Sequence, residues 1–378
     1  MCANLDSWLA AEDPAEAEAC ARRLLGVPGP GHRARLLAAA DVHPHKFGLT
    51  LLTAWQARGD ALEKDQAARV RGAAERQSRQ AALARELCRA VPGVWRLKGP
   101  STSRLYPTGV LRHEYDIDLC APGEPELWAV ARLLAGRGWV PRAVWMRAGR
   151  DGRDRQTGVV LQSAAHEADI VEVTTDPLEG DHWRVDSRPL DLAGTDSASL
   201  AFLLLVEEGS ARPYGVRDVY DGALLLGELA RTGRGGCAGE LLAAAGLGAQ
   251  WARLRRGLLR SGLVADPYEL VPPTGRRAPA VRSLRRPVRS GLLLLGHLVR
   301  RHQWAPGVGL LTRAQAVLGA ERCYRSRVAL HGVRVGGPGH PGGTAALRFA
   351  GPLGMLTTPV GDFALSIGGD VLEEWLDR

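Results

Sequence analysis

The sequence predicts an α+β protein in which a small mixed sheet with helices is embedded between helical regions, with a small β-rich segment at the C-terminal end. Three observations predict it. Apolar residues recur at helical spacing through residues 1–90, strand-like runs alternate with short helical ones between Val94 and Leu178, and Gly and Pro separate short strand-like runs near the end of the chain. We therefore divide the chain into a helical N-terminal region (1–90), a core (91–190), a helical domain with a basic linker at 271–290 (191–320) and a β-rich segment (321–378).

Within the core, glycine and proline mark where the elements begin and end. Gly99 breaks the first strand, Pro100 suits the first turn of a helix, and Gly136 ends the next helix. The expected elements are a strand at Val94–Lys98, a helix at Ser101–Tyr106, a strand at Asp116–Cys120, a helix at Pro125–Gly136, a strand at Trp139–Met146 and a hairpin of Val159–Gln162 with Ile170–Thr174.

The regions on either side of the core follow the same periodicity argument. Helices are expected at Ala61–Ala90, within Ser197–Ser261, at Leu292–Leu318 and at Val371–Leu376, and strands at Val328–Val335, Ala345–Ala350, Gly354–Thr358 and Phe363–Ile367.

Composition limits the class of protein. A chain of 378 residues with 45% hydrophobic content is long enough for two or three domains, and no apolar run reaches the length that spans a bilayer. The N-terminus lacks a basic region followed by an apolar stretch, so we expect a cytoplasmic protein without a membrane partner. The six cysteines are scattered without a Cys-x-x-Cys pair, which argues against a zinc site or a disulfide framework.

The formal net charge of +8 raises the question of a nucleic-acid partner. Lysine occurs only at positions 46, 64 and 98 while arginine is abundant, as expected from a GC-rich coding sequence. Base composition therefore accounts for part of the charge, and we expect no nucleic-acid partner. The basic linker at 271–290 is interpreted as a flexible connector. Nothing in the sequence specifies an oligomeric state.

Two carboxylates in the core form the strongest functional signal. In Asp116-Ile117-Asp118, the strand period of two places both acids on one face while Ile117 points into the core. Like charges this close are stabilised by a cation, and hard oxygen ligands suit Mg²⁺. Such a pair also occurs by chance in solvated loops, so the preceding strand, glycine turn and helix start matter, because together they make a natural phosphate cradle.

The blocks Leu97-Lys98-Gly99, Leu105-Tyr106-Pro107, Leu111-Arg112 and Asp116-Ile117-Asp118-Leu119 resemble a bacterial uncharacterised nucleotidyltransferase family of the DNA polymerase β-like superfamily. All four blocks occur in the family's order, and the Arg217-Asp218-x-x-Asp221 block that follows is similar as well. The resemblance covers roughly residues 35 to 225 and implies a polymerase β-like core, a small mixed sheet with catalytic carboxylates on adjacent strands. Pro100 stands where the superfamily usually has Gly or Ser.

A third carboxylate is expected on a later strand, and Asp169 and Glu172 are the candidates. They are three residues apart, so a strand places them on opposite faces. Glu172 is preferred because Val171 and Val173 then fill the core, whereas the alternative would bury a carboxylate there. The family also carries an acid at this position, usually followed by a hydrophobic residue and His-Trp, but Thr174 and Thr175 stand here instead.

Cationic residues border the predicted turn. Lys98 would offer a compact ammonium to a phosphate, and Arg112 is placed to meet the triphosphate or an anionic acceptor. The structural alternatives are a lysine at a strand end and an ordinary surface arginine. The expected nucleotide-binding residues are Lys98, Gly99, Ser101 and Arg112, and the expected catalytic and metal-binding residues are Asp116, Asp118 and Glu172, with Asp169 as the alternative third ligand.

These expectations combine into an enzyme that depends on two Mg²⁺ ions and transfers a nucleoside monophosphate from an NTP, expected to be ATP, to an acceptor with release of pyrophosphate. The acceptor would be a hydroxyl or similar group of a small molecule or peptide, for example in natural-product biosynthesis. Two alternatives stay open. One is a non-catalytic, antitoxin-like binding protein that keeps the nucleotidyltransferase fold, and the other is an RNA-directed nucleotidyltransferase, whose binding would weaken steeply with salt.

Overall fold

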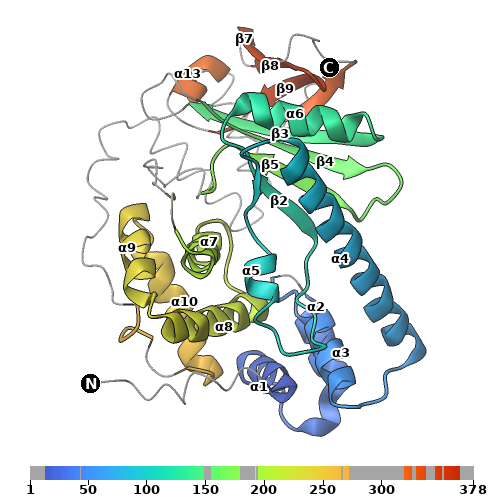
Figure 1. Ribbon diagram of the computed structural model, residues 1–378, viewed down its shortest axis with the longest axis vertical. Coiled ribbons are helices and arrows are strands. Elements are labelled where there is room, and N and C mark those ends of the chain that lie inside the picture. The colour runs from blue at the N-terminus through green and yellow to red at the C-terminus, as the bar shows by residue number, and fades with distance from the viewer. Residues whose placement is uncertain are drawn as a thin grey trace. The chain divides into compact units, whose positions relative to one another are not determined.

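The computed structural model describes residues 13–42, 44–148, 155–178, 192, 195–264, 267–271, 319–325, 329–337, 345–350 and 353–366 (Figure 1). The chain divides into two compact units, each assembled from segments far apart in the sequence. The helical unit comprises residues 1–79, 98–114 and 188–278, and the sheet unit comprises residues 80–97, 115–187 and 279–378. The expected linker beyond residue 271 and the expected helices at Leu292–Leu318 and Val371–Leu376 lie outside the described residues.

Side-chain caps fix the first residues of two helices in the helical unit. Asp13 caps α1 by accepting a hydrogen bond from the Ala15 N–H at 2.7 Å, and Asp196 caps α7 in the same way. The helices of this unit are α1 (Pro14–Leu25), the 3-10 helix η3 (Pro30–His32), α2 (Arg33–Asp41), α3 (Gly48–Ala57), α5 (Pro100–Ser103), α7 (Ser197–Ala211), α8 (Val216–Thr232), α9 (Gly235–Ala245) and α10 (Gly248–Ser261). Helix α4 (Lys64–Ala90) begins in this unit and continues into the sheet unit.

Aromatic contacts tie the helical unit together. Tyr220 of α8 makes edge contacts with Phe47, 5.4 Å between ring centroids, and with Tyr106, 5.3 Å. Phe202 of α7 and Trp251 of α10 meet in the same geometry at 5.3 Å. The segment that follows α5 is therefore anchored to α8 through Tyr106.

The sheet unit is built on one mixed sheet, which in the described residues has nine strands in the order β1-β2-β5-β4-β3-β6-β9-β8-β7. Only the β2–β5 pair among them is parallel, and the other neighbouring pairs are antiparallel. The strands are β1 (Trp95–Arg96), β2 (Asp116–Cys120), β3 (Trp139–Ala148), β4 (Arg155–Ser163), β5 (Ile170–Thr174), β6 (Leu330–Gly336), β7 (Ala346–Ala350), β8 (Leu353–Thr358) and β9 (Gly361–Ser366).

A single core lies between this sheet and the helices that cover it, α6 (Glu124–Ala135), α13 (Ala320–Arg325) and the end of α4 (Figure 1). Trp128 of α6 is fully buried in it with Ile117 of β2 and Val171 of β5. Leu330 and Phe363, from the last strands, belong to the same cluster and are also fully buried. The C-terminal strands therefore complete the core that the earlier strands begin.

This sheet is larger than the sequence predicts. The α+β class and the mixed sheet are confirmed, and each of the four expected C-terminal runs overlaps a strand. The expectation of a small sheet is wrong, because β6 pairs with β3 and the C-terminal strands extend the same sheet. In the described part of the chain, every helix is too short or too polar to cross a bilayer.

Candidate functional site

Three acidic residues share one face of the sheet unit. Strands β2 and β5 run parallel, with Asp118 directly opposite Glu172 and Asp116 directly opposite Ile170. Residues paired in this way point to the same side of a sheet, and residues two apart along a strand do so too. Asp116, Asp118 and Glu172 therefore lie on one face.

The opposite face of the same two strands packs into the core. Ile117 and Leu119 of β2 and Val171 and Val173 of β5 are fully buried there. Asp116, in contrast, is exposed, and Asp118 and Glu172 are half-buried. The apolar residues thus fix the orientation of the strands, and the three acids are turned away from the core by the strand alternation.

The other candidate for the third acid has a different setting. Asp169 is buried and precedes β5, in the turn of the β4–β5 hairpin. Its N–H donates to the His166 carbonyl at 2.8 Å, and its carbonyl accepts from the Ser163 N–H at 3.0 Å. The register thus brings Glu172, and not Asp169, opposite Asp118.

Glu172 is oriented by a residue that the sequence does not single out. The indole N–H of Trp145 on β3 donates to Glu172 Oε1 at 3.2 Å. Trp145 is paired with Gly158 on β4, and a Cβ at Gly158 would lie 2.2 Å from the indole nitrogen. The glycine therefore leaves room for the indole that holds the carboxylate. Sequence reasoning identified Trp145 only as part of a strand.

The acid set has the chemistry of a magnesium site. Asp116, Asp118 and Glu172 offer hard oxygen donors, which Mg²⁺ prefers. Neighbouring acids on β2 are two residues apart, which separates their Cα atoms by about 6.5 Å along the strand. Among the described residues, no three His, Cys, Asp or Glu side chains converge closely enough to hold a metal ion in the present geometry. The donor types and the shared face fit the ion, and binding would require the side chains to turn toward one another.

The predicted phosphate turn lies in the helical unit. Gly99 has φ of 101°, a conformation that favours glycine, and it precedes the short helix α5. The N–H groups of Thr102 and Ser103 both donate to the Gly99 carbonyl, and Pro100 has no N–H. The N–H of Ser101, a half-buried residue of α5, does not donate to the Gly99 carbonyl.

The predicted cations of this turn are paired with acids from α7 and α8. Lys98 Nζ lies 2.9 Å from Glu208 Oε1, and Arg112 lies 2.9 Å from Asp221 Oδ2. Tyr106 donates its hydroxyl to the other oxygen of Asp221 at 2.6 Å. Asp221 thus orders Arg112.

The opposite charges shift the pKa of one member of each ion pair, Glu208 and Arg112. Burial alone would raise the pKa of Glu208, but the charges of Lys98 and Arg212 hold it well below its ordinary value. Burial alone would lower the pKa of Arg112, but Asp221 outweighs it and raises that pKa. Glu208 and Arg112 therefore both carry their charge at neutral pH.

The space between these pairs is small. The pocket has a volume of about 20 Å³ and is lined by Lys98, Gly99, Thr102, Arg112, Ala201, Leu205, Glu208, Arg217, Asp218 and Asp221. That volume is about the room that one water molecule occupies. A triphosphate at Lys98 and Arg112 would therefore have to exchange with Glu208 and Asp221 and open the pocket.

The predicted site residues thus fall into two sets. Asp116, Asp118 and Glu172 belong to the sheet unit, and the predicted nucleotide-binding residues belong to the helical unit. The partners Glu208 and Trp145 had no local signal in the sequence, since each is far along the chain from the residue it contacts. In comparisons with known proteins, no family model, no curated protein and no solved structure matches the chain.

Proposed function

We propose that the protein is a Mg²⁺-dependent nucleotidyltransferase that transfers a nucleoside monophosphate from an NTP, with ATP as the first candidate donor, to a small-molecule or peptide acceptor. One observation supports this most. The parallel register of β2 and β5 sets Asp118 beside Glu172 on the face that also carries Asp116. Three oxygen-donor side chains on the face of the sheet opposite its core are a suitable ligand set for the ions that phosphoryl transfer uses.

In this proposal Asp116, Asp118 and Glu172 would hold Mg²⁺, which when bound supplies positive charge against the triphosphate and the leaving pyrophosphate. The acceptor hydroxyl oxygen forms a bond to the α-phosphorus, and the bond from that phosphorus to the oxygen bridging to the β-phosphorus breaks. The hydroxyl proton passes to Glu172, whose carboxylate the Trp145 indole N–H orients. Lys98, Gly99, Ser101 and Arg112 remain the proposed contacts to the triphosphate.

The experiment is a thermal unfolding series with each of ATP, GTP, CTP and UTP in the presence of Mg²⁺. A bound NTP that contributes about 1 kcal/mol should raise Tm by roughly 2–4 °C. Asp116→Asn and Asp118→Asn should abolish the rise, because each removes an anionic metal ligand without changing side-chain volume. Glu167→Gln is the matched control, since Glu167 is an exposed acid in the β4–β5 turn and is not part of the set.

The outcomes of this experiment support or contradict the proposed metal site. A rise with one NTP that persists in Glu167→Gln and disappears in both Asp variants supports the transferase. An equal rise in all variants would contradict the metal site.

A non-catalytic binding protein is the second candidate, and the closed pocket favours it. Lys98 and Arg112 already have acid partners, and the space between them holds only about 20 Å³. This candidate predicts no response to any NTP with Mg²⁺ and no difference between the native protein and Asp118→Asn.

A further inference from the structure

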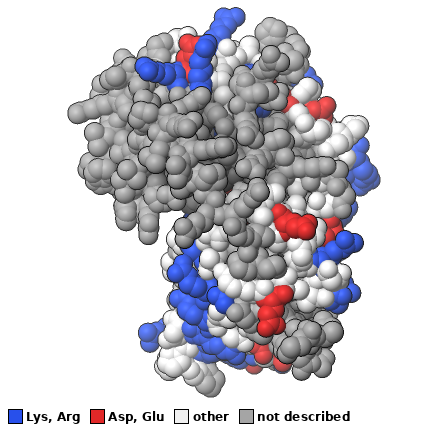
Figure 2. All heavy atoms as spheres, turned by 90° about the vertical axis from the view of Figure 1, so that its left-hand side faces the viewer, with Lys and Arg blue, Asp and Glu red and all other residues white. Residues whose placement is uncertain are grey.

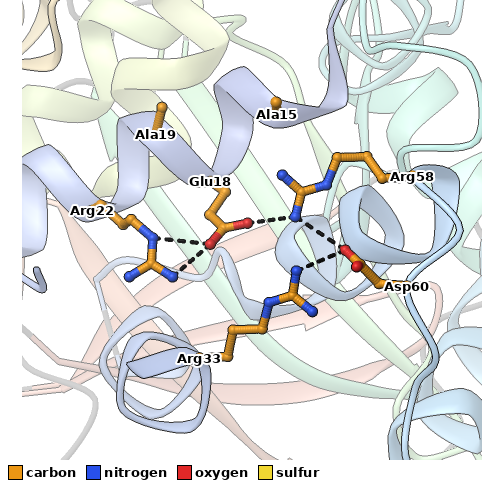
Figure 3. Close-up of a pocket in the computed structure, with 7 residues that line it drawn as sticks. All are labelled: Ala15, Glu18, Ala19, Arg22, Arg33, Arg58 and Asp60. Atoms are coloured by element: carbon orange, nitrogen blue, oxygen red, sulfur yellow. Dashed lines mark hydrogen bonds and ion pairs between the residues drawn. The ribbon is translucent and has the colours of Figure 1, made fainter. Parts of the chain in front are cut away.

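A second cavity, broadly open to solvent and of about 380 Å³, lies in the helical unit and is lined mainly by charged side chains (Figure 3). We call its three basic residues, Arg22 of α1, Arg33 of α2 and Arg58 at the end of α3, the arginine cluster. Three separate helices thus bring one guanidinium each to the same cavity. The complete lining is Ala15, Glu18, Ala19, Arg22, Arg33, Arg58 and Asp60.

Two acids hold the arginine cluster in place. Glu18 accepts from Arg22 Nη2 and from Arg58 Nη2, both at 2.6 Å, and also from the Trp55 indole N–H at 2.8 Å. Asp60 then accepts from Arg58 at 3.1 Å and from Arg33 at 2.8 Å. As Figure 3 shows, the contacts form a chain that alternates in charge and begins and ends with an arginine.

Glu18 is the anchor of this chain. It is 7% exposed, and burial alone would raise its pKa, but its hydrogen bonds from Arg22, Arg58 and Trp55 outweigh this and lower it. Arg33 is fixed a second time, because its guanidinium lies over the Trp55 ring at 5.0 Å from the centroid. The cluster is therefore oriented before any ligand arrives.

Glu18 and Asp60 neutralise only part of the positive charge of the arginine cluster and accept from only some of its N–H donors. Three arginines against Glu18 and Asp60 leave one net positive charge, and a guanidinium carries five N–H donors. Within the described residues, Arg33 donates through Nη2 alone, and its side chain is 41% exposed. The remaining N–H donors of Arg33 can therefore be reached by a ligand that accepts hydrogen bonds.

The cavity has room for such a ligand because α1 carries small residues toward it. Ala15 and Ala19, one helical turn apart, line the cavity beside Glu18. A volume of about 380 Å³ falls within the range of small-molecule sites, roughly 300–1,000 Å³. It is larger than an inorganic anion requires.

We propose that the arginine cluster binds the phosphoryl group of a small phosphorylated molecule. Guanidinium groups that arrive from three helices can each contact a different oxygen of a tetrahedral phosphoryl group, whereas a planar carboxylate presents only two oxygens. This site is independent of the proposed transferase, since none of its residues belongs to that site.

The experiment is calorimetric titration of the full chain with inorganic phosphate, at constant ionic strength maintained with NaCl. Arg33→Gln removes the most exposed member of the cluster and leaves Asp60 paired with Arg58, and it should weaken binding by about tenfold or more. Arg35→Gln is the matched control, because Arg35 lies on the same helix, is exposed and does not line the cavity.

A second pair of variants tests the cavity without changing charge. Ala19→Leu should narrow the cavity beside Glu18 and weaken phosphate binding even if Arg33→Gln fails to fold, and Ala38→Leu, at an exposed position of α2, should not. Saturable binding that Arg33→Gln and Ala19→Leu weaken and both controls keep supports the site. Absence of saturable binding in the native protein, or equal loss in variants and controls, would leave the cluster a structural ion network. Acetate binding as tightly as phosphate would overturn the phosphoryl assignment.

Discussion

His113 is a buried histidine surrounded by positive charge. It is 7% exposed, and burial together with the charges of Arg76, Arg69 and Arg217 lowers its pKa from 6.5 to about 3. The folded protein thus keeps this imidazole neutral at pH values where the unfolded chain would protonate it. The resulting contribution to stability is complete above pH 6.5 and is lost as the pH falls toward 3.

We therefore expect the free energy of unfolding to decrease by about 1 kcal/mol for each pH unit below 6.5 through this residue. His113→Gln should flatten that part of the pH dependence, while His32→Gln, at an exposed histidine, should leave it unchanged. Chemical unfolding at pH 7.5 and pH 5 measures both. An unchanged slope in His113→Gln would mean that another group titrates.

The sequence could predict the orientation of a side chain only where neighbouring residues in the sequence determine it. Alternation alone places Asp116 and Asp118 on one face, and the preference for Glu172 rests on the same argument. The glycine turn at Gly99 is equally local. Glu208 is 110 residues from Lys98 and Asp221 is 109 from Arg112, so the ion pairs of these cations depend on packing that no local pattern contains.

The indole of Trp145 on β3 lies close against its cross-strand neighbour Gly158 on β4. A Cβ at Gly158 would come within 2.2 Å of the Trp145 indole nitrogen, and Trp145 is 5% exposed, so it has little freedom to move away. Gly158→Ala should therefore destabilise the protein by about 1–3 kcal/mol. Gly72→Ala should do the opposite and stabilise by about 0.5–1 kcal/mol, because Gly72 is an exposed position of α4 with no atom near its Cβ site.

Urea unfolding of the two glycine variants measures whether each change lowers or raises the free energy of unfolding as predicted. Loss of the native tryptophan fluorescence environment should accompany Gly158→Ala and not Gly72→Ala. If Gly158→Ala were as stable as the native protein, the indole would not be confined as the structure indicates.

The sequence predicted most of the helices and strands, but it did not predict which strands pair with one another. Apolar alternation bounded by Gly and Pro predicts the runs that form β2, β5 and the last strands. Which strand lies beside which depends on contacts distant in the sequence, and β6 against β3 is such a case. This is why the sheet proved larger than expected.

The molecule as a whole carries an excess of arginine, and part of it is neutralised locally. Figure 2 shows basic side chains gathered toward the lower left of the view, with acidic ones nearby. Exposed arginines such as Arg69 and Arg137 are paired with Asp41 and Glu86. Such pairing weakens the field that a polyanion would meet, in keeping with the small-molecule partner proposed above.

The dependence of the sheet unit on its last strands predicts the effect of truncation. A chain ending before Ala329 would lose the fully buried Leu330, Leu356 and Phe363 and would leave one edge of β3 unpaired. Each of these side chains contributes about 1.5–3 kcal/mol, so the loss approaches the total stability of a domain, about 5–15 kcal/mol. We expect this variant to aggregate.

Soluble yield and the thermal unfolding profile measure the outcome. A chain ending at Ser366 is the control, since it keeps every described strand. A soluble truncated protein with a cooperative transition would show that the first five strands are sufficient by themselves.

The pairing of β6 with β3 also bears on how the protein is made. A nascent chain leaves the ribosome N-terminus first, so β3 emerges long before β6. One edge of β3 can form its backbone hydrogen bonds only when β6 is present. Until then the nascent chain presents a ten-residue strand with one bare edge and an incomplete core beneath it. Folding of the sheet unit is therefore delayed until β6 has been synthesised, and protection of that edge during translation becomes a requirement that the finished structure no longer shows.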